Sequence, residues 1–319
     1  MNMAEALNLQ TLRGELRLNE PMARHVSWRA GGVAARTYAP ADLDDLSAFL
    51  RTNSGTGGLY FVGLGSNLLV RDGGVQATVV FTHWALRQIT LLAHTATSKG
   101  MGESEIEIHA GAGIASPKVA RFAALHGAEG AEFLAGIPGT VGGALAMNAG
   151  CYGGETWNLV KDVTTIDRAG VLHHRARSDF EIGYRSVKPV SAATEEWFVE
   201  ATFNVPLGEG SDAGEKSRNK IKELLSKRIA SQPLQQPNAG SVFRNPPNDY
   251  AARLIEASGL KGLRMGGAEI SKKHANFIVN VGGASAANIE ALIDRAQNTV
   301  REKFGVELER EVRIIGKRA

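Results

Sequence analysis

Short apolar runs separated by glycine-rich turns characterise the first half of the chain. The runs at 59–63 (LYFVG), 77–81 (ATVVF) and 105–113 (EIEIHAGAG) have the apolar density or the two-residue alternation of β-strands. Glycines cluster at 55–74 and again at 127–154. The pattern therefore predicts several strands that are joined by tight, glycine-rich turns.

Two segments show the three- and four-residue spacing of amphipathic helices. The segment 116–127 opens with Ser116, which suits a helix cap, and continues with an apolar stripe that ends at a glycine. The segment 285–305 is the stronger case, because it opens with serine, closes with glycine and repeats apolar residues throughout. The final run at 306–316 (VELEREVRIIG) alternates apolar and charged residues and predicts a strand.

Chain length and one polar segment predict two structural units. At 319 residues the chain exceeds the usual size of a single domain. The segment 207–220 (LGEGSDAGEKSRNK) is polar and glycine-rich, and we expect it to be a linker. This division gives a glycine-rich α/β portion at 15–207 and a smaller α+β portion at 215–319.

The composition is that of a globular protein, with 43% hydrophobic and 22% charged residues. No apolar run approaches the roughly eighteen residues of a membrane helix, and the first twenty residues lack the pattern of a signal peptide. Cys151 is the one cysteine, so neither an intrachain disulfide nor a zinc site of several thiolates can form. The histidines include no HExxH motif. We therefore expect a cytoplasmic protein without a metal site.

The net charge of +3 is too small to indicate nucleic-acid binding. One segment, 215–228 (EKSRNKIKELLSKR), nevertheless carries six basic residues against two acidic ones. Two interpretations are open for it. It is either the solvated face of a surface helix or a docking edge for a ligand that carries phosphate.

The segment FVGLGSNLLVRDGG places Gly63 and Gly65 directly after a predicted strand, together with Ser66 and Asn67. Backbone N–H groups of such a loop can surround a pyrophosphate, and the two polar side chains can add donors. The segment is not a GxGxxG motif, because Leu68 occupies the position of the third glycine, and it lacks the GK[ST] of a Walker loop. A plain tight turn is the alternative.

The segment AGIPGTVGGALAMNAGCYGGE contains seven glycines and no charged residue before Glu155. Such a stretch can let a flat ring system lie against the backbone, with Thr140 and Asn148 satisfying ring heteroatoms. A flavin isoalloxazine suits it, and a buried structural crossover is the alternative. Cys151 has no activating base or cation near it in sequence, and we interpret it as a small packing residue.

Five further motifs accompany these two segments, and together they carry a family resemblance. They are HVSWRAGG at 25–32, GYRSV at 183–187, NAGSVFRNP at 238–246, KKHANFIVN at 272–280 and LEREVRIIG at 308–316. In this order, over nearly the whole chain, they resemble the bacterial UDP-N-acetylenolpyruvoylglucosamine reductase family of peptidoglycan precursor synthesis. Several motifs of this length in one order are more specific than any single one.

The resemblance implies an α+β protein with two parts. The first, at 15–207, would be an FAD-binding domain of the vanillyl-alcohol-oxidase type with two α/β subdomains, and the second, at 215–319, a smaller substrate-binding domain. FAD would be bound noncovalently and NADPH would be the reductant. The implied reaction reduces UDP-N-acetylglucosamine enolpyruvate to UDP-N-acetylmuramate. We expect a monomer that binds these small molecules and neither nucleic acid nor a membrane.

The resemblance also implies roles for individual residues. The catalytic positions of the family match Arg185, Ser241 and Glu311. Its substrate contacts match Tyr184, Lys227, Arg228 and Asn245, the basic pair with altered local spacing. Its cofactor contacts match Gly63, Leu64, Gly65, Ser66, Asn67 and Leu68 in the first glycine-rich segment and Gly136, Ile137, Pro138, Gly139, Thr140, Gly142, Gly143, Ala144 and Asn148 in the second.

In the implied mechanism Arg185 pairs with the substrate carboxylate, and Glu311 shares a proton with it or orients the arginine. Ser241 would deliver a proton to the carbanion that hydride addition creates. From the sequence pattern alone, Arg185 would be a surface cation, Glu311 a solvent-facing carboxylate and Ser241 a turn residue. The strand alternation would place the glutamate on the same face as Glu307 and Glu309.

The chain departs from the family pattern in two places. Trp28 and Ala30 replace a phenylalanine and a branched or polar residue, which concerns local packing. The stretch 262–271 is too short for a tyrosine-bearing loop that closes over the substrate, so the chain resembles the branch that lacks this lid.

Two rival functions remain. One is another FAD-dependent oxidoreductase of the same flavin fold, although the phosphate-binding segment has no histidine or cysteine that could tether a flavin covalently. The other is a noncatalytic nucleotide-binding module.

Overall fold

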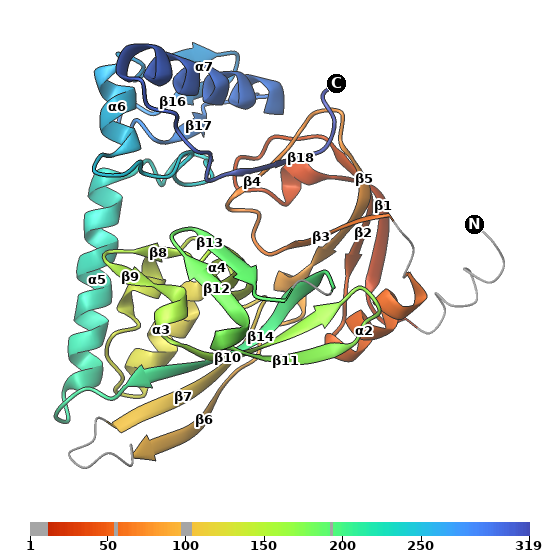
Figure 1. The fold of residues 1–319 in the computed structure, drawn as a ribbon, viewed down its shortest axis with the longest axis vertical. Coiled ribbons are helices and arrows are strands. Elements are labelled where there is room, and N and C mark those ends of the chain that lie inside the picture. Colours follow the sequence, from red (N-terminus) through yellow and green to blue (C-terminus); the bar gives the residue numbers. More distant parts are fainter. Residues whose placement is uncertain (1–11, 54–56, 97–103, 192–193) are drawn as a thin grey trace. The chain divides into compact units, whose positions relative to one another are not determined.

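The computed structural model describes residues 12–53, 57–96, 104–191 and 194–319 (Figure 1). Part of the segment examined for a signal peptide, residues 1–11, lies outside this description. The helices are α2 (Leu43–Thr52), α3 (Ser116–Leu125), α4 (Val141–Ala146), α5 (Ala213–Ser231), α6 (Ala251–Ala257) and α7 (Ala286–Phe304). The strands are β1 (Glu15–Pro21), β2 (Val33–Ala39), β3 (Gly58–Val62), β4 (Leu68–Val70), β5 (Val75–Phe81), β6 (Ile89–Ala96), β7 (Ser104–Gly111), β8 (Gly150–Cys151), β9 (Gly154–Glu155), β10 (Val160–Asp167), β11 (Leu172–Ala176), β12 (Phe180–Gly183), β13 (Ser186–Pro189), β14 (Glu196–Pro206), β15 (Arg264–Met265), β16 (Ala268–Ile270), β17 (Ile278–Asn280) and β18 (Arg313–Ile315).

Contacts divide the chain into two compact units. Unit 1 consists of Met1–Leu16, Tyr38–Gly63 and Val79–Ser226, and unit 2 of Arg17–Thr37, Leu64–Thr78 and Lys227–Ala319. Strands β1, β2 and β5 of the sheet β1-β2-β5-β3 contribute residues to both units. The sequence pattern does not anticipate that amino-terminal segments join the carboxyl-terminal unit. The division into an FAD-binding domain at 15–207 and a substrate-binding domain at 215–319 stays a prediction. Contacts between residues show which segments pack together and not which ligand each domain binds.

Unit 1 is built on a five-stranded antiparallel sheet of order β11-β10-β14-β7-β6. Helix α4 packs against β14 and β7, and α3 packs against the short helical turn at Glu132–Gly136. The core under these helices is mainly aliphatic and includes Ile106, Ile108 and Val119 at 0% exposure. Because the glycine-rich segment 135–155 runs through this core, its backbone is held by well-packed neighbours.

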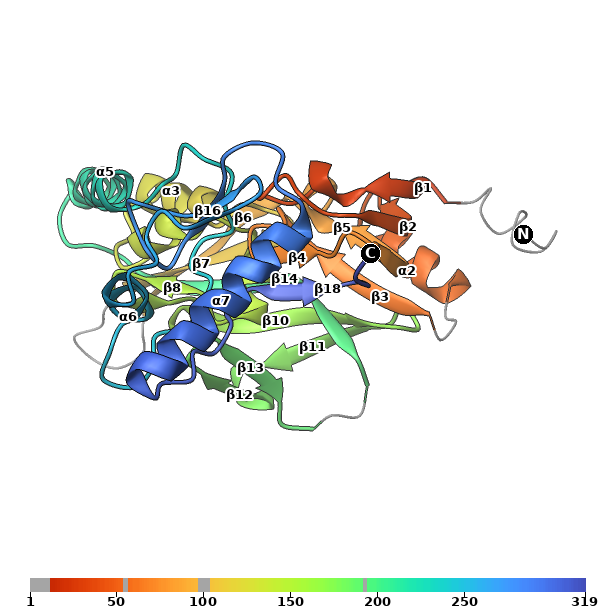
Figure 2. The ribbon, with the colours of Figure 1, turned by 90° about the horizontal axis from the view of Figure 1, so that it is seen from above.

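Unit 2 combines helices α6 and α7 with the small sheet β15-β16-β17 (Figures 1 and 2). Its core includes Trp28, which is completely buried and donates from Nε1 to the carbonyl of Ile278 at 2.7 Å. A buried indole N–H needs such a partner, and this one supports the tryptophan where the family pattern has phenylalanine. A second sheet in this unit pairs β18 with β4 in parallel, so the carboxyl-terminal strand lies beside the segment that follows the predicted phosphate loop.

Most of the predicted elements are present. Strands β3, β5 and β7 and helices α3 and α7 occupy the predicted segments. Helix α7 begins after Ser285, whose side chain accepts from the N–H of Asn288, and ends at Gly305 with φ of 67°. The cap of α3 is Ala115 rather than Ser116.

Two predicted elements were wrong in extent. The predicted linker at 207–220 overlaps α5, which begins at Ala213. This helix buries small and apolar residues at 213, 217, 221 and 224, and the small ones hide the helical pattern. The predicted strand at 306–316 is a strand only at Arg313–Ile315, where β4 offers a partner.

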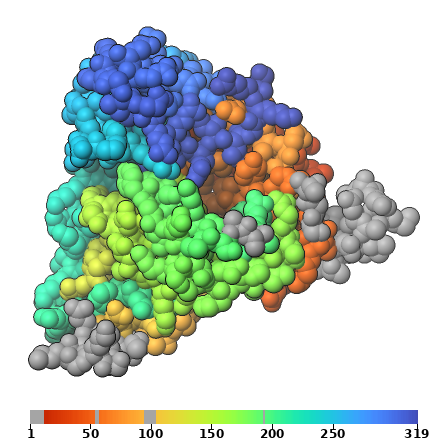
Figure 3. Space-filling view, in the orientation of Figure 1, coloured from red at the N-terminus to blue at the C-terminus, as the bar shows by residue number. Residues whose placement is uncertain are grey.

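A buried carboxylate ties three distant segments of unit 2 together. Glu290 on α7 accepts hydrogen bonds from Arg71, after β4, and from Arg318, after β18. Figure 3 shows an orange patch from the segment near residue 70 surrounded by blue carboxyl-terminal surface. The hydrogen bonds from Arg71 are the largest of the effects that lower the pKa of Glu290 to about 2. The ion pair therefore fixes the ends of the β4–β18 pair to the helix.

Substitution Glu290→Gln should lower the free energy of unfolding by about 2–4 kcal/mol at pH 7, because it leaves the partly buried guanidinium of Arg71 without its anion and removes the partner of the exposed Arg318. A carboxylate with a lowered pKa stabilises the fold above its unfolded pKa of 4.5, and this contribution is lost as the pH falls towards 2. Urea unfolding between pH 7 and pH 3 should therefore show the two proteins converging at low pH. The exposed Glu302→Gln on the same helix is the control, and an equal effect of both substitutions would contradict the account.

Candidate functional site

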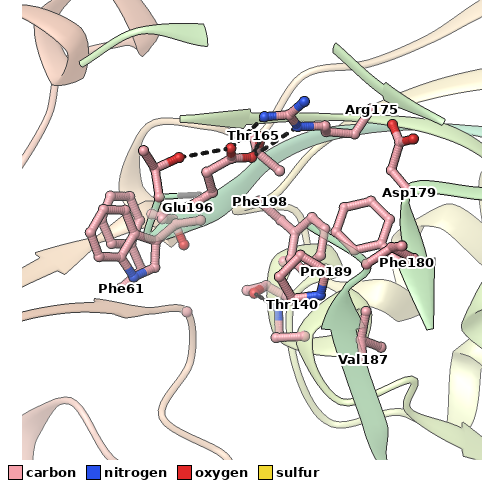
Figure 4. A pocket seen from close by; sticks show the side chains of 18 of the residues that line it. Phe61, Thr140, Thr165, Arg175, Asp179, Phe180, Val187, Pro189, Glu196 and Phe198 are labelled. Atoms are coloured by element: carbon pink, nitrogen blue, oxygen red, sulfur yellow. Dashed lines mark hydrogen bonds and ion pairs between the residues drawn. The ribbon is translucent and has the colours of Figure 1, made fainter. Parts of the chain in front are cut away.

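A cavity of about 460 Å³ lies within unit 1, and its size is within the range of small-molecule sites (Figure 4). Gly63, Thr140, Gly142 and Gly143 of the two glycine-rich segments form what we call its glycine wall, and strands of the five-stranded sheet and the hairpin β12–β13 contribute further lining residues. Its lining includes Phe61, Gly63, Thr140, Gly142, Gly143, Thr165, Arg175, Phe180, Val187, Pro189, Glu196, Trp197 and Phe198. Four of the predicted cofactor residues therefore share one cavity.

The glycine wall depends on direct contact between the two glycine-rich segments. A β-carbon placed on Gly63 would lie 2.2 Å from Oγ1 of Thr140, so any other residue would push the segments apart. Thr140 is buried and its hydroxyl oxygen accepts from the N–H of Gly143 at 3.5 Å, at the start of α4. A β-carbon added to Gly143 would have this hydroxyl oxygen as its nearest neighbour outside the helix backbone, at 3.8 Å. The face of a flat ring can therefore approach the backbone there.

Four aromatic side chains line the cavity on two of its sides, and we refer to them together as its aromatic wall. Phe61 on β3 and Trp197 on β14 stack with their ring centres 4.7 Å apart and their planes 12° from parallel. Phe180 and Phe198 form a further tilted pair with centres 5.5 Å apart. Figure 4 shows Phe61 on one side of the cavity and Phe180 with Phe198 on the other. Flat apolar walls of this kind suit a heteroaromatic ring.

A carboxylate whose two oxygens both accept hydrogen bonds lines the polar end of the cavity. Glu196 accepts from Nε and Nη2 of Arg175 and from the hydroxyl groups of Thr165 and Thr194. The hydrogen bonds from Arg175 are the largest cause that lowers the pKa of Glu196, to about 2. This end of the cavity is therefore held rigidly as an ion pair at neutral pH.

The remaining predicted cofactor residues of unit 1 lie away from the cavity lining. Gly136, Ile137 and Ala144 are buried in the core, and Pro138 is exposed. Asn148 is completely buried, and both hydrogens of its amide go to protein acceptors. Their assignment as cofactor contacts stays a prediction.

Arg185 lies in a two-residue turn at the tip of the hairpin β12–β13, where Gly183 pairs with Ser186. The residue has φ of 53°, in the left-handed region. Its guanidinium donates to the carbonyl of Gly150 at 2.9 Å and to that of Asn148 at 3.4 Å. The guanidinium carbon lies 5.0 Å from the ring centre of Tyr184, which is 47% exposed. The structure thus brings Asn148, Tyr184 and Arg185 together at one edge of unit 1.

The predicted phosphate loop runs from Gly63 to Leu68, and all of it except Gly63 belongs to unit 2. Gly65 has φ of 59°, and an added β-carbon would lie 2.2 Å from the carbonyl oxygen of His25. The N–H of Ser27 donates to the carbonyl of Gly65 at 3.2 Å, so the HVSWRAGG motif supports this turn from behind. The side-chain amide of Asn67 donates to the carbonyl of Glu311 at 3.0 Å.

Ser241 and Glu311 are brought close together by backbone pairing within unit 2. The N–H of Glu311 donates to the carbonyl of Val242 at 2.8 Å, and Phe243 forms a bridge with Arg310. Ser241 and Glu311 are both half-buried, so pattern alone was wrong in grouping Glu311 with the exposed Glu307 and Glu309. Unit 2 therefore gathers Asn67, Ser241 and Glu311.

The predicted substrate contacts in unit 2 are less closely grouped. Lys227 is exposed and Arg228 is half-buried on α5, where Arg228 donates to Gln232 at 2.8 Å. Asn245 is exposed, and its side-chain oxygen accepts from the N–H of Ala251 at 3.2 Å, at the start of α6. The shared role of these three residues in substrate binding stays a prediction.

The residues present fit a flavin dinucleotide. Within unit 1 the glycine wall leaves room for a flat ring, which the aromatic wall matches. Within unit 2, taken by itself, the Gly65 turn presents backbone at the predicted phosphate position. In the described segments no three histidine, cysteine or acidic residues cluster as metal ligands would. None of the helices in the described part of the chain has the length and apolar character that crossing a bilayer requires.

Sequence reasoning missed the aromatic wall and the Glu196–Arg175 pair. Phe61 and Trp197 lie on strands far apart in sequence, and an aromatic residue on a strand ordinarily indicates core packing. No local signal distinguishes a core ring from one that lines a cavity. The two rings meet only because strands of two different sheets lie near each other in the folded chain.

Comparison with known proteins agrees with the resemblance. Residues 34–175 match the model of the FAD binding domain, and residues 232–315 match that of the UDP-N-acetylenolpyruvoylglucosamine reductase C-terminal domain. The UDP-N-acetylenolpyruvoylglucosamine reductase of Nitrosospira multiformis is 54% identical, over 99% of this chain and 94% of that protein. That of Thiobacillus denitrificans is also 54% identical, over 96% and 94% of the two chains.

A solved structure with the same name, from Thermus caldophilus, is 30% identical and superposes with a TM-score of 0.73 over 96% of this chain and 100% of that one. The predicted fold class is confirmed: an FAD-binding domain of the vanillyl-alcohol-oxidase type is followed by the carboxyl-terminal domain of the reductase. The chain belongs to the UDP-N-acetylenolpyruvoylglucosamine reductase family.

Proposed function

We propose that this protein reduces UDP-N-acetylglucosamine enolpyruvate to UDP-N-acetylmuramate with NADPH, and that Arg185, Ser241 and Glu311 manage the charge and the proton. One structural observation carries the proposal. The hairpin β12–β13 lines the cavity through Phe180, Val187 and Pro189, and the same hairpin presents Arg185 at its tip. A cofactor cavity and an anion-binding residue are thus parts of one element.

When bound in this protein, FAD would supply the hydride-transfer chemistry that links NADPH to the substrate alkene. In unit 1 the groups that would hold the cofactor are Gly63, Thr140, Gly142 and Gly143. In unit 2 they are the backbone and side chains of residues 64–68, including Asn67. The cavity walls exclude water from the ring, which favours hydride transfer over side reactions.

Reduction of the vinyl ether leaves negative charge on the carbon beside the substrate carboxylate. Arg185, a planar and permanently charged group, would pair with that carboxylate. Glu311 would share a proton with the developing acid or orient the guanidinium. The hydroxyl of Ser241 is a weak acid, but it can protonate so basic a carbanion when it is held in place. The contact between Val242 and Glu311 supports a joint role for the last two.

Substitution Ser241→Ala should leave the bleaching of the flavin by NADPH unchanged and slow flavin reoxidation by the substrate by about 100- to 10,000-fold, the range of general acid catalysis. Stopped-flow absorbance measures both half-reactions. The exposed Ser226→Ala serves as control and should change neither. Equal slowing of the two half-reactions by Ser241→Ala would refute the role of this serine.

Substitution Lys227→Ala should weaken binding of the substrate diphosphate about 3- to 10-fold at low salt, and added salt should narrow the difference, since an exposed charge acts through a screened field. Titration calorimetry at two salt concentrations measures it. Lys222→Ala, exposed on the same helix, should bind like the unaltered protein. If Lys227→Ala also binds the substrate as tightly as the unaltered protein, the phosphate site lies elsewhere.

The second candidate, another FAD-dependent oxidoreductase, makes different predictions. Consumption of NADPH that depends on UDP-N-acetylglucosamine enolpyruvate would support the reductase, and consumption without it would favour the alternative. Denaturation should release all the flavin, because no histidine or cysteine in the phosphate-binding segment can tether it. We further infer that the protein is a cytoplasmic monomer of the branch without a tyrosine lid, in which 262–271 is a short connection.

A further inference from the structure

Asn148 is a buried hub of hydrogen bonds immediately after helix α4. It is 0% exposed and has φ of 40°, a conformation that asparagine tolerates better than most residues. Its Nδ2 donates to a carboxylate oxygen of Glu155 at 2.9 Å and to the carbonyl of Gly183 at 3.1 Å. Its Oδ1 accepts from the N–H of Trp157 at 3.2 Å. Both amide hydrogens are therefore committed to protein partners.

The same residue holds the Tyr184–Arg185 turn from two sides. The side chain of Asn148 bonds the carbonyl of Gly183, which precedes the turn, and its main-chain carbonyl accepts from Nη1 of Arg185 at 3.4 Å. The second guanidinium contact, from Nη2 to Gly150, goes to a residue two positions further along the same segment. The plane of the guanidinium is thus set by the backbone that Asn148 anchors.

Glu155 supports Asn148 from the other side. It lies on β9, directly paired with Gly150 on β8, the residue whose carbonyl receives Arg185. Its carboxylate accepts from Asn148 and is half-buried. Asn148, Glu155 and Gly150 therefore form one bonded frame behind the arginine.

We propose that Asn148 is a positioning residue for Arg185, supported by Glu155, rather than a direct contact of the cofactor ring. An arginine pairs productively with a carboxylate only when the plane of its guanidinium is correctly oriented. A displacement of about 1 Å can lower the rate about 100-fold. The frame accepts hydrogen bonds from two of the N–H groups of Arg185 and thereby sets the orientation of the whole guanidinium. This inference rests on the proposed role of Arg185.

The test combines single and double substitutions in the holoenzyme. Asn148→Ala should slow flavin reoxidation by the substrate about 10- to 100-fold and leave flavin reduction by NADPH within about 3-fold. In the Arg185→Ala background the same change should add less than about 3-fold, because the group it positions is gone. Amide hydrogen exchange at 183–186 should be faster in Asn148→Ala. Asn19→Ala, at an exposed residue with φ of 54°, controls for backbone strain.

Additive losses in the double variant, or equal slowing of both half-reactions, would overturn the proposal. Should Asn148→Ala fold poorly, Glu155→Ala replaces it and should slow reoxidation by about 3- to 10-fold. Glu155→Gln, which keeps an acceptor oxygen for Asn148, should restore the rate to within about 2-fold of the unaltered protein. Equal losses in these two variants would also overturn it. Absence of turnover in the unaltered protein would instead contradict the proposed function, so the two failures are distinguishable.

Discussion

The candidate site depends on backbone segments that approach one another more closely than a β-carbon permits. Gly63 meets the side chain of Thr140, and the Gly65 turn meets the carbonyl of His25. These contacts bring the two glycine-rich segments into place without intervening side chains, so backbone and small hydroxyl groups form the surface offered to a ligand. The high glycine content of the chain is explained at these positions by contact geometry and not by flexibility.

Around these contacts the structure places polar groups whose hydrogen-bonding capacity is largely satisfied. Glu196 at the polar end of the cavity, Glu290 behind β4 and β18, and the amide of Asn148 each serve several donors or acceptors. Glu290 and Asn148 are buried and Glu196 is partly buried, and a polar group removed from water in this way is stable only when it is hydrogen-bonded. It then fixes a single local geometry. The residues that would contact the substrate, by contrast, are half-buried or exposed, as a group that must meet a ligand has to be.

Local patterns predicted a large part of the fold and, in the candidate site, the two glycine-rich segments that line the cavity. The strand runs, the capped helix α7 and the glycine-rich segments were evident because each depends on residues close in sequence. The family resemblance supplied Arg185, Ser241 and Glu311, and the structure brings the last two together through the pairing of Val242 with Glu311. Stacking of Phe61 on Trp197 depends on the approach of strands from two different sheets, and the frame around Asn148 depends on turns with positive φ. No local pattern encodes either. Helix α5 was partly hidden by its small buried residues.

The central claim is that one guanidinium, one carboxyl group and one hydroxyl together manage the anion formed when the alkene is reduced. A crystal structure of the protein with FAD and UDP-N-acetylglucosamine enolpyruvate tests it most directly. The account predicts Arg185 paired with the substrate carboxylate, Glu311 within hydrogen-bonding distance of either, and the hydroxyl of Ser241 facing the carbon that becomes protonated. A substrate carboxylate bound away from these three residues would contradict it.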